Sequence, residues 1–208
     1  MFQLTHPTHD TVRQLMLAVE EADYNYAEHP LLTRPKTVGL EAGYRHDHVR
    51  EEVGSGLAVF ETAVAAFRDW KMFPPAMVEL LPLRDEIAVG NIVAIIARGG
   101  GLWSYNACRI FEVVDDETET EQRFGFSYAT LPHHVARGEE RFLLRYNRDT
   151  EQVTYEIEVF SRADHWTAKL TAPYFRHIQR RFRRLSMDAI RTAVQSGNQV
   201  PPSPVPGG

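Results

Sequence analysis

The feature that most constrains the fold is a period-two alternation in the second half of the chain. Over about 124–131, 141–146 and 153–159, apolar side chains alternate with polar or small ones. This period places successive side chains on opposite faces of a β-strand. A short turn, NRDTEQ at 147–152, separates the last two segments, and turns this short join antiparallel neighbours. The sequence therefore predicts an antiparallel meander rather than a series of βαβ units.

Three further strands are predicted upstream of this meander. Residues 87–97 are nearly all apolar, which is typical of a strand that is buried on both faces. A second strand is predicted over 103–114, and three glycines at 99–101 favour a turn between the two. A short strand is expected over 44–53. The alternation in the second strand predicts that three side chains share one face: Arg109, Phe111 and Val113.

Helical periodicity appears in three segments. The first, 8–22, begins with a threonine that can cap it. The second, about 56–70, carries an apolar stripe and stops before two prolines, and 76–81 is expected to add one further turn. In the last, apolar residues recur every three or four positions over 175–193. Residues 23–42 lack a clear period and are predicted to form an extended segment that wraps the surface.

This order of elements predicts an α+β fold. A curved antiparallel sheet of about six or seven strands wraps around the long C-terminal helix, because a sheet must bury one face against another layer. The last helix carries the only long apolar stripe left to cover the concave face. We expect one domain over 1–196, with an N-terminal helical and extended segment. The proline-rich tail, 197–208, is expected to be disordered.

Composition and charge exclude several classes of function. The formal charge of −5 argues against a nucleic-acid binder. Cys108 is the only cysteine, which excludes an intrachain disulfide and a multi-cysteine metal site and fits a reducing compartment. The longest aliphatic run, 92–97, is too short to span a membrane, and the first residues lack the apolar core of a signal peptide. We expect a cytoplasmic protein without a metal or cofactor; the oligomeric state stays open.

Several motifs together resemble a known family. GSGLAVFETAVAAFRDWKMF, RFGFSYATLPHHVARGEERFLLRY, VFSRAD and PYFRHIQRRF are similar to the plant and bacterial domain-of-unknown-function family numbered nineteen-ninety. The resemblance covers about 26–193, and Ala129 and Ala163 stand where that family has glycine and proline. The family in turn resembles the START-like, helix-grip superfamily of hydrophobic-ligand carriers and some enzymes. The resemblance implies that fold and brings no established activity.

A polar loop and the strand that follows it hold the first candidate residues. His133 lies in the loop, and Glu139 and Glu140 begin the next strand. A histidine near carboxylates could carry out acid–base chemistry. The favoured alternative is a turn in which one glutamate pairs with an arginine such as Arg162 or Arg109. Arg162 could equally bind a ligand carboxylate through two hydrogen bonds.

Our leading hypothesis is a small-molecule binding or carrier domain. Its ligand would be apolar with one polar end, and would lie between the concave face and the last helix with Arg162 or Arg109 near the polar end. The aromatic side chains that could line such a cavity, or simply fill the core, are Trp103, Tyr105, Phe111, Phe124, Phe126, Tyr128, Tyr155 and Phe175. The candidate ligand-binding residues are Trp103, Arg109, Phe126, Tyr128, His133, Glu139, Glu140 and Arg162.

Two other kinds of function are kept as alternatives. A hydrolase or cyclase on the same fold would use His133 or Glu139, although the sequence favours binding over catalysis. An interaction module would use the arginines of the last helix, which are more often a solvated face and lie on its side away from the apolar stripe: Arg176, Arg180, Arg183 and Arg184. His46 and His48 have strand spacing that offers two metal ligands, but the sequence shows no third.

Overall fold

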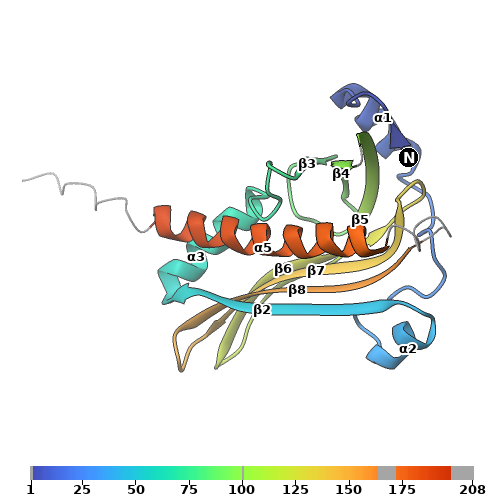
Figure 1. Cartoon of the computed structure of the whole chain (residues 1–208). Helices are drawn as coiled ribbons and strands as arrows, with labels where there is room; N and C mark the ends of the chain where they lie inside the picture. The colour runs from blue at the N-terminus through green and yellow to red at the C-terminus, as the bar shows by residue number, and fades with distance from the viewer. Residues whose placement is uncertain (1, 100, 164–171, 198–208) are drawn as a thin grey trace, which may run out of the picture.

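A computed structural model describes residues 2–99, 101–163 and 172–197 (Figure 1). The helices are α1 (His9–Ala18), α2 (Lys36–Glu41), α3 (Leu57–Arg68) and α5 (Ala172–Gly197). The strands are β1 (Phe2–Gln3), β2 (Arg45–Ser55), β3 (Val78–Pro82), β4 (Ile92–Gly99), β5 (Leu102–Glu117), β6 (Glu121–Thr130), β7 (Ala136–Asn147) and β8 (Gln152–Ala163).

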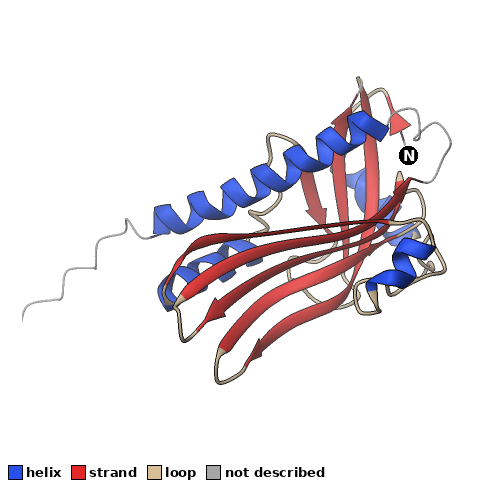
Figure 2. Ribbon diagram, turned by 60° about the horizontal axis from the view of Figure 1, so that its bottom comes forward, coloured by secondary structure: helices blue, strands red, loops and turns tan. Residues whose placement is uncertain are grey.

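These strands form one curved antiparallel sheet. Its order is β2-β8-β7-β6-β5-β4-β3, and the short β1 pairs with β5. The helix α5 lies across the concave face (Figures 1 and 2). The predicted α+β fold, a sheet that grips a C-terminal helix, is therefore confirmed. No helix in the described ranges is long and apolar enough to cross a membrane.

The main core lies between the concave face of the sheet and the two helices α3 and α5. Phe67 of α3 packs edge-on against Tyr155 of β8, with ring centroids 5.2 Å apart. Phe126 and Phe142, on neighbouring strands, stack at 5.3 Å. From α5, Ile190 is fully buried in the same cluster. Aromatic side chains thus fill much of the space between sheet and helix, as one of the two sequence interpretations expected.

A second layer covers part of the convex face. Met16 of α1 belongs to a buried cluster with Ile92 and Ile96 of β4. The segment 23–42 then wraps along the strand ends, and its Tyr26, Leu31 and Leu32 pack against Ala129 and Phe160. The extended segment predicted from sequence contains a helix that was not predicted, α2. Its Gly39 lies so close to Phe160 that a Cβ atom would be 2.7 Å from the ring.

Three local predictions are wrong. Residues 76–81 do not continue a helix but lead into the edge strand β3, which pairs with β4. The last residue of β3, Pro82, is tolerated because an edge strand has one unpaired side. The strand expected from residue 87 begins at Ile92. A bulge between Ile110 and Glu112 shifts the register of β5, so Val113 joins the concave cluster and does not share a face with Phe111.

The last helix agrees with its predicted range, and α5 ends at Gly197; the rest of the predicted tail lies outside the described residues. Arg180 and Arg184 are exposed, as expected for a solvated face. Arg183 departs from the prediction, since it is buried and lies 3.8 Å from Asp47 of β2. The cause is helical geometry, because Arg183 is one turn before the buried Met187. The side chain of Arg176 is outside the described set.

Candidate functional site

Two consecutive glutamates of β7 point to opposite faces of the sheet. Successive side chains of a strand alternate between faces, so Glu139 reaches the convex side and Glu140 the concave side. Glu140 pairs with Tyr128 and Val159 of the concave cluster. Glu139 pairs with Ala129 and Phe160 of the convex cluster. The two carboxyl groups predicted as candidates therefore belong to two different sites.

Glu139 is fixed by the N-terminal wrapping segment. Its Oε1 accepts hydrogen bonds from the Tyr26 hydroxyl at 2.6 Å and the backbone N–H of Leu31 at 2.7 Å, and Oε2 accepts from the N–H of Leu32 at 2.8 Å. His29 Nδ1 lies 2.8 Å from Oε1. Burial raises the pKa of Glu139, but these hydrogen bonds outweigh burial and hold the pKa below its ordinary value. The expected arginine partner is replaced by a tyrosine, a histidine and two backbone amides.

Glu140 lies under the first half of α5. The Tyr128 hydroxyl donates to its Oε2 at 2.5 Å. Burial raises the pKa of Glu140 to about 7, and the Tyr128 hydrogen bond and the charge of Arg183 oppose that rise only in part. Burial also raises the pKa of Tyr128, so the phenol keeps its proton and remains the donor. A small cavity of about 90 Å³ adjoins this pair and is also lined by Thr130 and Gln179.

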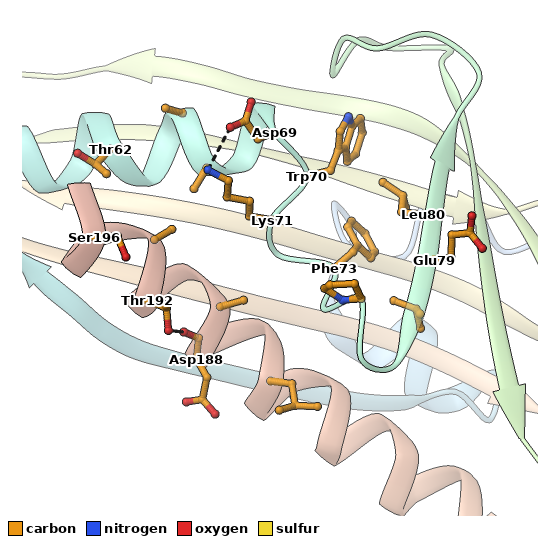
Figure 3. Close-up of a pocket in the computed structure, with 17 residues that line it drawn as sticks. Thr62, Asp69, Trp70, Lys71, Phe73, Glu79, Leu80, Asp188, Thr192 and Ser196 are labelled. Atoms are coloured by element: carbon orange, nitrogen blue, oxygen red, sulfur yellow. Dashed lines mark hydrogen bonds and ion pairs between the residues drawn. The ribbon is translucent and has the colours of Figure 1, made fainter. Parts of the chain in front are cut away.

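A much larger opening lies at the other end of α5. We call it the α3–α5 groove; its volume is about 1250 Å³. Figure 3 shows side chains from α3, the loop after it, β3 and α5 facing this space. Its apolar lining is Ala65, Ala66, Trp70, Phe73, Pro75, Val78, Leu80, Leu185, Ala189 and Ala193. The groove occurs at the edge of the sheet, where β3 is the last strand in the described part of the chain.

The chain reverses sharply where α3 ends, and this reversal builds one wall of the groove. Trp70 adopts a left-handed conformation with φ of 58°, and the N–H of Lys71 bonds to the carbonyl of Ala66 at 2.9 Å. Pro74 and Pro75 then prevent the helix from continuing. The Trp70 indole N–H donates to the Asp85 carbonyl at 3.1 Å, which holds its ring against Phe126 at 5.4 Å.

Polar groups form the rim of the α3–α5 groove. Lys71 and Asp69 pair at 3.2 Å, and both side chains are more than half exposed. Glu79 of β3 is bound at 2.7 Å by His6 and at 2.6 Å by His9, which ties the groove edge to the start of α1. An apolar floor with a charged rim suits a ligand that has an apolar body and one polar end.

Arg109 and Arg162 lie on the convex side, away from α5. Arg109 donates to the carbonyls of Val19 and Glu20 at 3.2 and 2.6 Å. Arg162 donates to the carbonyl of Ala42 at 2.6 Å. Each arginine therefore caps the C-terminal end of a helix, α1 or α2, where carbonyls lack helical partners. Neither is placed to hold the polar end of a ligand on the concave face.

The other predicted residues are divided between three places. Phe126 and Tyr128 lie in the concave core. Trp103 packs at the α1 side of the sheet, with its ring 4.5 Å from that of His6. His133 is exposed, with φ of 72°. The eight candidates thus do not converge on one site, and an enzyme that uses His133 with Glu139 gains no support, since hydrogen bonds already occupy both Glu139 oxygens.

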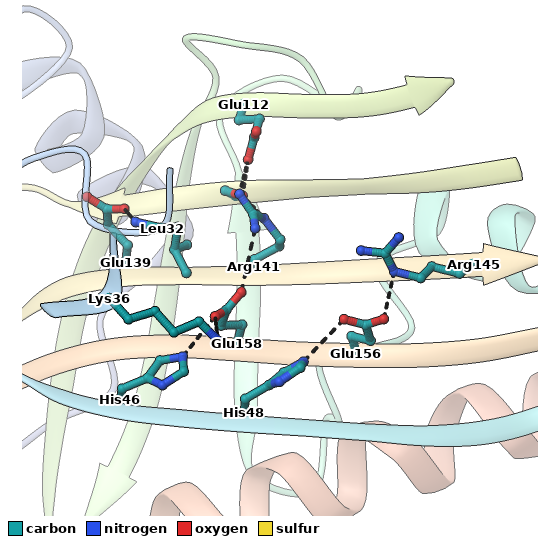
Figure 4. A network of polar contacts seen from close by, with 11 residues as sticks. Leu32, Lys36, His46, His48, Glu112, Glu139, Arg141, Arg145, Glu156 and Glu158 are labelled. Atoms are coloured by element: carbon teal, nitrogen blue, oxygen red, sulfur yellow. Dashed lines mark hydrogen bonds and ion pairs between the residues drawn. The ribbon is translucent and has the colours of Figure 1, made fainter. Parts of the chain in front are cut away.

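A network of charges covers the exposed part of the convex face (Figure 4). Glu158 contacts His46 at 2.8 Å and Lys36 at 3.3 Å, and Arg141 at 3.5 Å. His48 is bound in the same way, to Glu156 at 3.2 Å. Each of the two histidines that resembled metal ligands therefore contacts a glutamate of β8. Within the described ranges, no three histidine, cysteine, aspartate or glutamate side chains gather as a metal site.

The fold and the groove define a helix-grip protein whose sheet and C-terminal helix leave an opening at one edge. Residues 26–189 match the family described as a domain of unknown function (DUF1990). The chain belongs to this family, as the motifs predicted.

Two curated relatives support this family assignment, and one solved structure shares the fold. A UPF0548 protein of Dictyostelium discoideum is 35% identical over 161 residues, which cover 74% of each chain. A UPF0548 protein of Deinococcus radiodurans is 33% identical over 192 residues, covering 87% of this chain and 92% of the relative. The crystal structure of TTHA0849 from Thermus thermophilus shares the fold, with a TM-score of 0.52 and 11% identity over 74% of this chain and all of that chain.

Sequence reasoning missed two sets of residues. The groove lining comes mainly from small side chains such as Ala65, Ala189 and Ala193, which carry no chemical signal of their own. His29 was missed because it lies in the segment without periodicity, 110 residues from its partner Glu139. The motif GEE gave a signal for His29. If one of its glutamates is buried, its carboxylate requires hydrogen-bond donors from elsewhere in the chain.

Proposed function

We propose that this protein binds an apolar small molecule in the α3–α5 groove. The observation that carries the proposal is the groove itself, about 1250 Å³ with a mostly apolar lining. Small-molecule sites in proteins are typically concave, apolar and about 300–1,000 Å³. A groove somewhat larger than this accepts an extended ligand.

The shape of the lining favours a slender apolar body. Ala65 and Ala66 of α3 and Ala189 and Ala193 of α5 all line the groove. These short side chains on both helices leave room in the groove for a slender ligand. Phe73 closes the floor, where its ring packs 5.9 Å from that of Phe182. The ligand therefore rests on this aromatic floor rather than entering the packed core beneath it.

The rim supplies the place for a polar end. Lys71 is the cation that lines the groove, and its only ion pair among the described residues is with the exposed Asp69. An exposed ion pair of this kind contributes about 1 kcal/mol or less, so an anionic ligand group can replace Asp69 at little cost. A long-chain carboxylate satisfies both the alanine-lined groove and this lysine.

Binding of a dansylated undecanoic acid, followed by its fluorescence, tests the proposal. We expect saturable binding in the micromolar range. Ala65→Trp fills the groove from an exposed position on α3 and is expected to weaken binding roughly tenfold or more. Lys71→Met is expected to weaken the carboxylate but not the corresponding alcohol.

The matched control is Ala58→Trp, since Ala58 is exposed on the same helix about two turns earlier and does not line the groove. It is expected to leave binding unchanged. Equal affinity in the wild-type protein and in both tryptophan variants would place the probe elsewhere and refute the proposal, as would the absence of saturable binding.

A further inference from the structure

A second pocket lies on the convex face, on the opposite side of the sheet from α5. It measures about 440 Å³ and is bounded by the wrapping segment, by β5 and by the loop at Val89 and Gly90. We call it the His29 pocket. Its lining includes Tyr24, His29, Arg109, Phe111 and Glu112. Its volume is within the range of about 300–1,000 Å³ that small-molecule sites occupy.

His29 is held in one orientation. Its Nδ1 lies 2.8 Å from Glu139 Oε1, and Glu139 is a carboxylate at neutral pH because its pKa is lowered. Nδ1 therefore carries a proton and donates to Glu139, and in the neutral form of the ring Nε2 is an acceptor. The imidazole ring lies 4.1 Å from the ring of Tyr24 and 4.7 Å from that of Phe111. No residue in the described part of the chain bonds to Nε2.

Arg109 brings a positive charge to the same pocket. Its Nη2 bonds to two backbone carbonyls, and its guanidinium lies 5.5 Å from the centre of the Tyr24 ring. It forms no ion pair with any residue that the structure describes. The one carboxylate lining the pocket, Glu112, already accepts from Ser127 at 2.6 Å and Arg141 at 2.9 Å. Arg109 is thus a cation without a counter-charge.

Arg162 shows what a purely structural arginine looks like in this protein. It caps α2 through the carbonyl of Ala42 at 2.6 Å and lies 4.6 Å from the Tyr44 ring centre, just as Arg109 caps α1 and lies over Tyr24. Arg162 also has a carboxylate partner, Glu28, at 3.5 Å. The two arginines have the same capping role, but Arg109 lines the His29 pocket and, among the residues that the structure describes, has no carboxylate partner like Glu28.

We propose that the His29 pocket binds a small planar carboxylate that carries a hydroxyl at its far end. The carboxylate pairs with Arg109, the planar body packs against the rings of Tyr24 and Phe111, and the hydroxyl donates to His29 Nε2. The two polar ends of the ligand thus meet a charge and an acceptor atom that no other group in the described structure pairs with. This site does not depend on the α3–α5 groove.

Titration with para-hydroxybenzoate, benzoate and phenol, followed by the NMR signals of the His29 ring, tests the proposal. We expect para-hydroxybenzoate to bind tightest, because only it engages both Arg109 and His29. Arg109→Met is expected to weaken both carboxylates roughly tenfold and to leave phenol unchanged. Arg109→Lys, which keeps the charge, is expected to recover part of the affinity, and this separates charge from helix capping.

The variant His29→Asn tests the proposed ligand contact of Nε2 separately from the contact of His29 with Glu139. An asparagine amide can still donate to Glu139 but offers nothing in place of Nε2. In this variant, measured by calorimetry, para-hydroxybenzoate is expected to bind no better than benzoate. Ala65→Trp in the groove is expected to change none of these affinities, so failure of one proposal is distinguishable from failure of the other.

The matched control is Arg162→Met, which removes the equivalent cap of α2. It is expected to bind all three probes as the wild-type protein does. Two results would overturn the proposal: no saturable shift of the His29 signals with any probe at millimolar concentrations, or equal weakening by Arg109→Met and Arg162→Met. The second result would show that Arg109 acts only by supporting the fold.

Discussion

Glu139 and Glu140 are chemically identical neighbours that meet opposite conditions on the two faces of one sheet. On the convex face, Glu139 accepts hydrogen bonds from Tyr26, Leu31 and Leu32 and contacts His29. On the concave face, the hydrogen bond to Glu140 comes from Tyr128 alone among the described residues. The pKa of Glu139 is lowered, whereas that of Glu140 is raised to about 7.

The difference teaches that hydrogen-bond donors oppose the effect of burial on a carboxyl, and that their number helps to decide whether it stays ionised. Burial raises the pKa of both groups, because a low-dielectric environment disfavours charge. Several donors reverse that effect for Glu139, and one donor does not for Glu140. Glu139 therefore acts as a permanent anchor for the wrapping segment. Glu140 is a proton-binding group beside a small cavity.

The largest expected effect comes from Gly138, whose backbone sets the position of both glutamates. Its φ is 149°, and a Cβ atom there would clash with the carbonyl oxygen of Phe160. Gly138→Ala should therefore separate β7 from β8 and lower the free energy of unfolding by about 3–5 kcal/mol, measured by urea denaturation. The control is Gly43→Ala, since Gly43 also has positive φ, 80°, but open space around its Cβ position. It should cost only about 1–2 kcal/mol; equal losses would contradict the clash.

The second prediction compares the loss of stability when each glutamate is replaced by alanine. Glu139→Ala leaves two backbone amides, a hydroxyl and an imidazole without their acceptor, so we expect a loss of about 2–4 kcal/mol in the free energy of unfolding. Glu140→Ala removes one acceptor and should cost about 1 kcal/mol. Hydrogen exchange of the Leu31 and Leu32 amides should increase only in Glu139→Ala. Similar losses in both variants would show that the number of donors does not matter.

A third prediction uses the opposite pKa shifts. Because the folded pKa of Glu140 is about 7 against an ordinary 4.5, the folded state binds the extra proton between these values, and stability falls as pH rises from about 4.5 to 7. We expect a loss of about 2–3 kcal/mol over this window, since one pKa unit corresponds to about 1.4 kcal/mol. Glu139 has the opposite sign: its contribution is present above 4.5 and is lost as the pH falls further.

Glu140→Gln isolates this effect. His134 titrates in the same window, since burial lowers its pKa to about 4 from 6.5, and its contribution falls as the pH drops. The difference between wild-type protein and Glu140→Gln cancels His134 and leaves Glu140 alone. A difference in unfolding free energy that stays constant from pH 4.5 to 8 would contradict the raised pKa.

The fold and the surroundings of the two glutamates differ in how far the sequence can predict them. The meander and the last helix follow from local periodicity, and both are as expected. The bulge after Ile110 and the edge strand β3 are set by pairing with other strands, which no local pattern encodes. GEE indicated two acidic side chains at the start of a strand. It did not indicate their partners, because those of Glu139 lie more than 100 residues earlier in a segment without a period.

The variant with the smallest expected effect changes the environment of Glu140 and keeps its carboxyl group. Tyr128→Phe deletes the one hydroxyl that donates to Glu140 and that holds its pKa down against burial. The pKa of Glu140 should therefore rise further, and the pH at which stability is lost should move upward with it. The cost at acidic pH should be only about 1 kcal/mol, since the protonated carboxyl needs a partner less than the charged form does.

Tyr155→Phe is the matched control for Tyr128→Phe. Tyr155 is also fully buried in the concave core, but its hydroxyl bonds to Ser186 at 2.7 Å and not to Glu140. This variant should lower stability without moving the pH at which stability is lost. If both phenylalanine variants move that pH equally, general packing of the core controls the Glu140 proton. If only Tyr128→Phe moves it, the Tyr128 hydroxyl controls the Glu140 proton, and a further donor placed there should lower the pKa of Glu140.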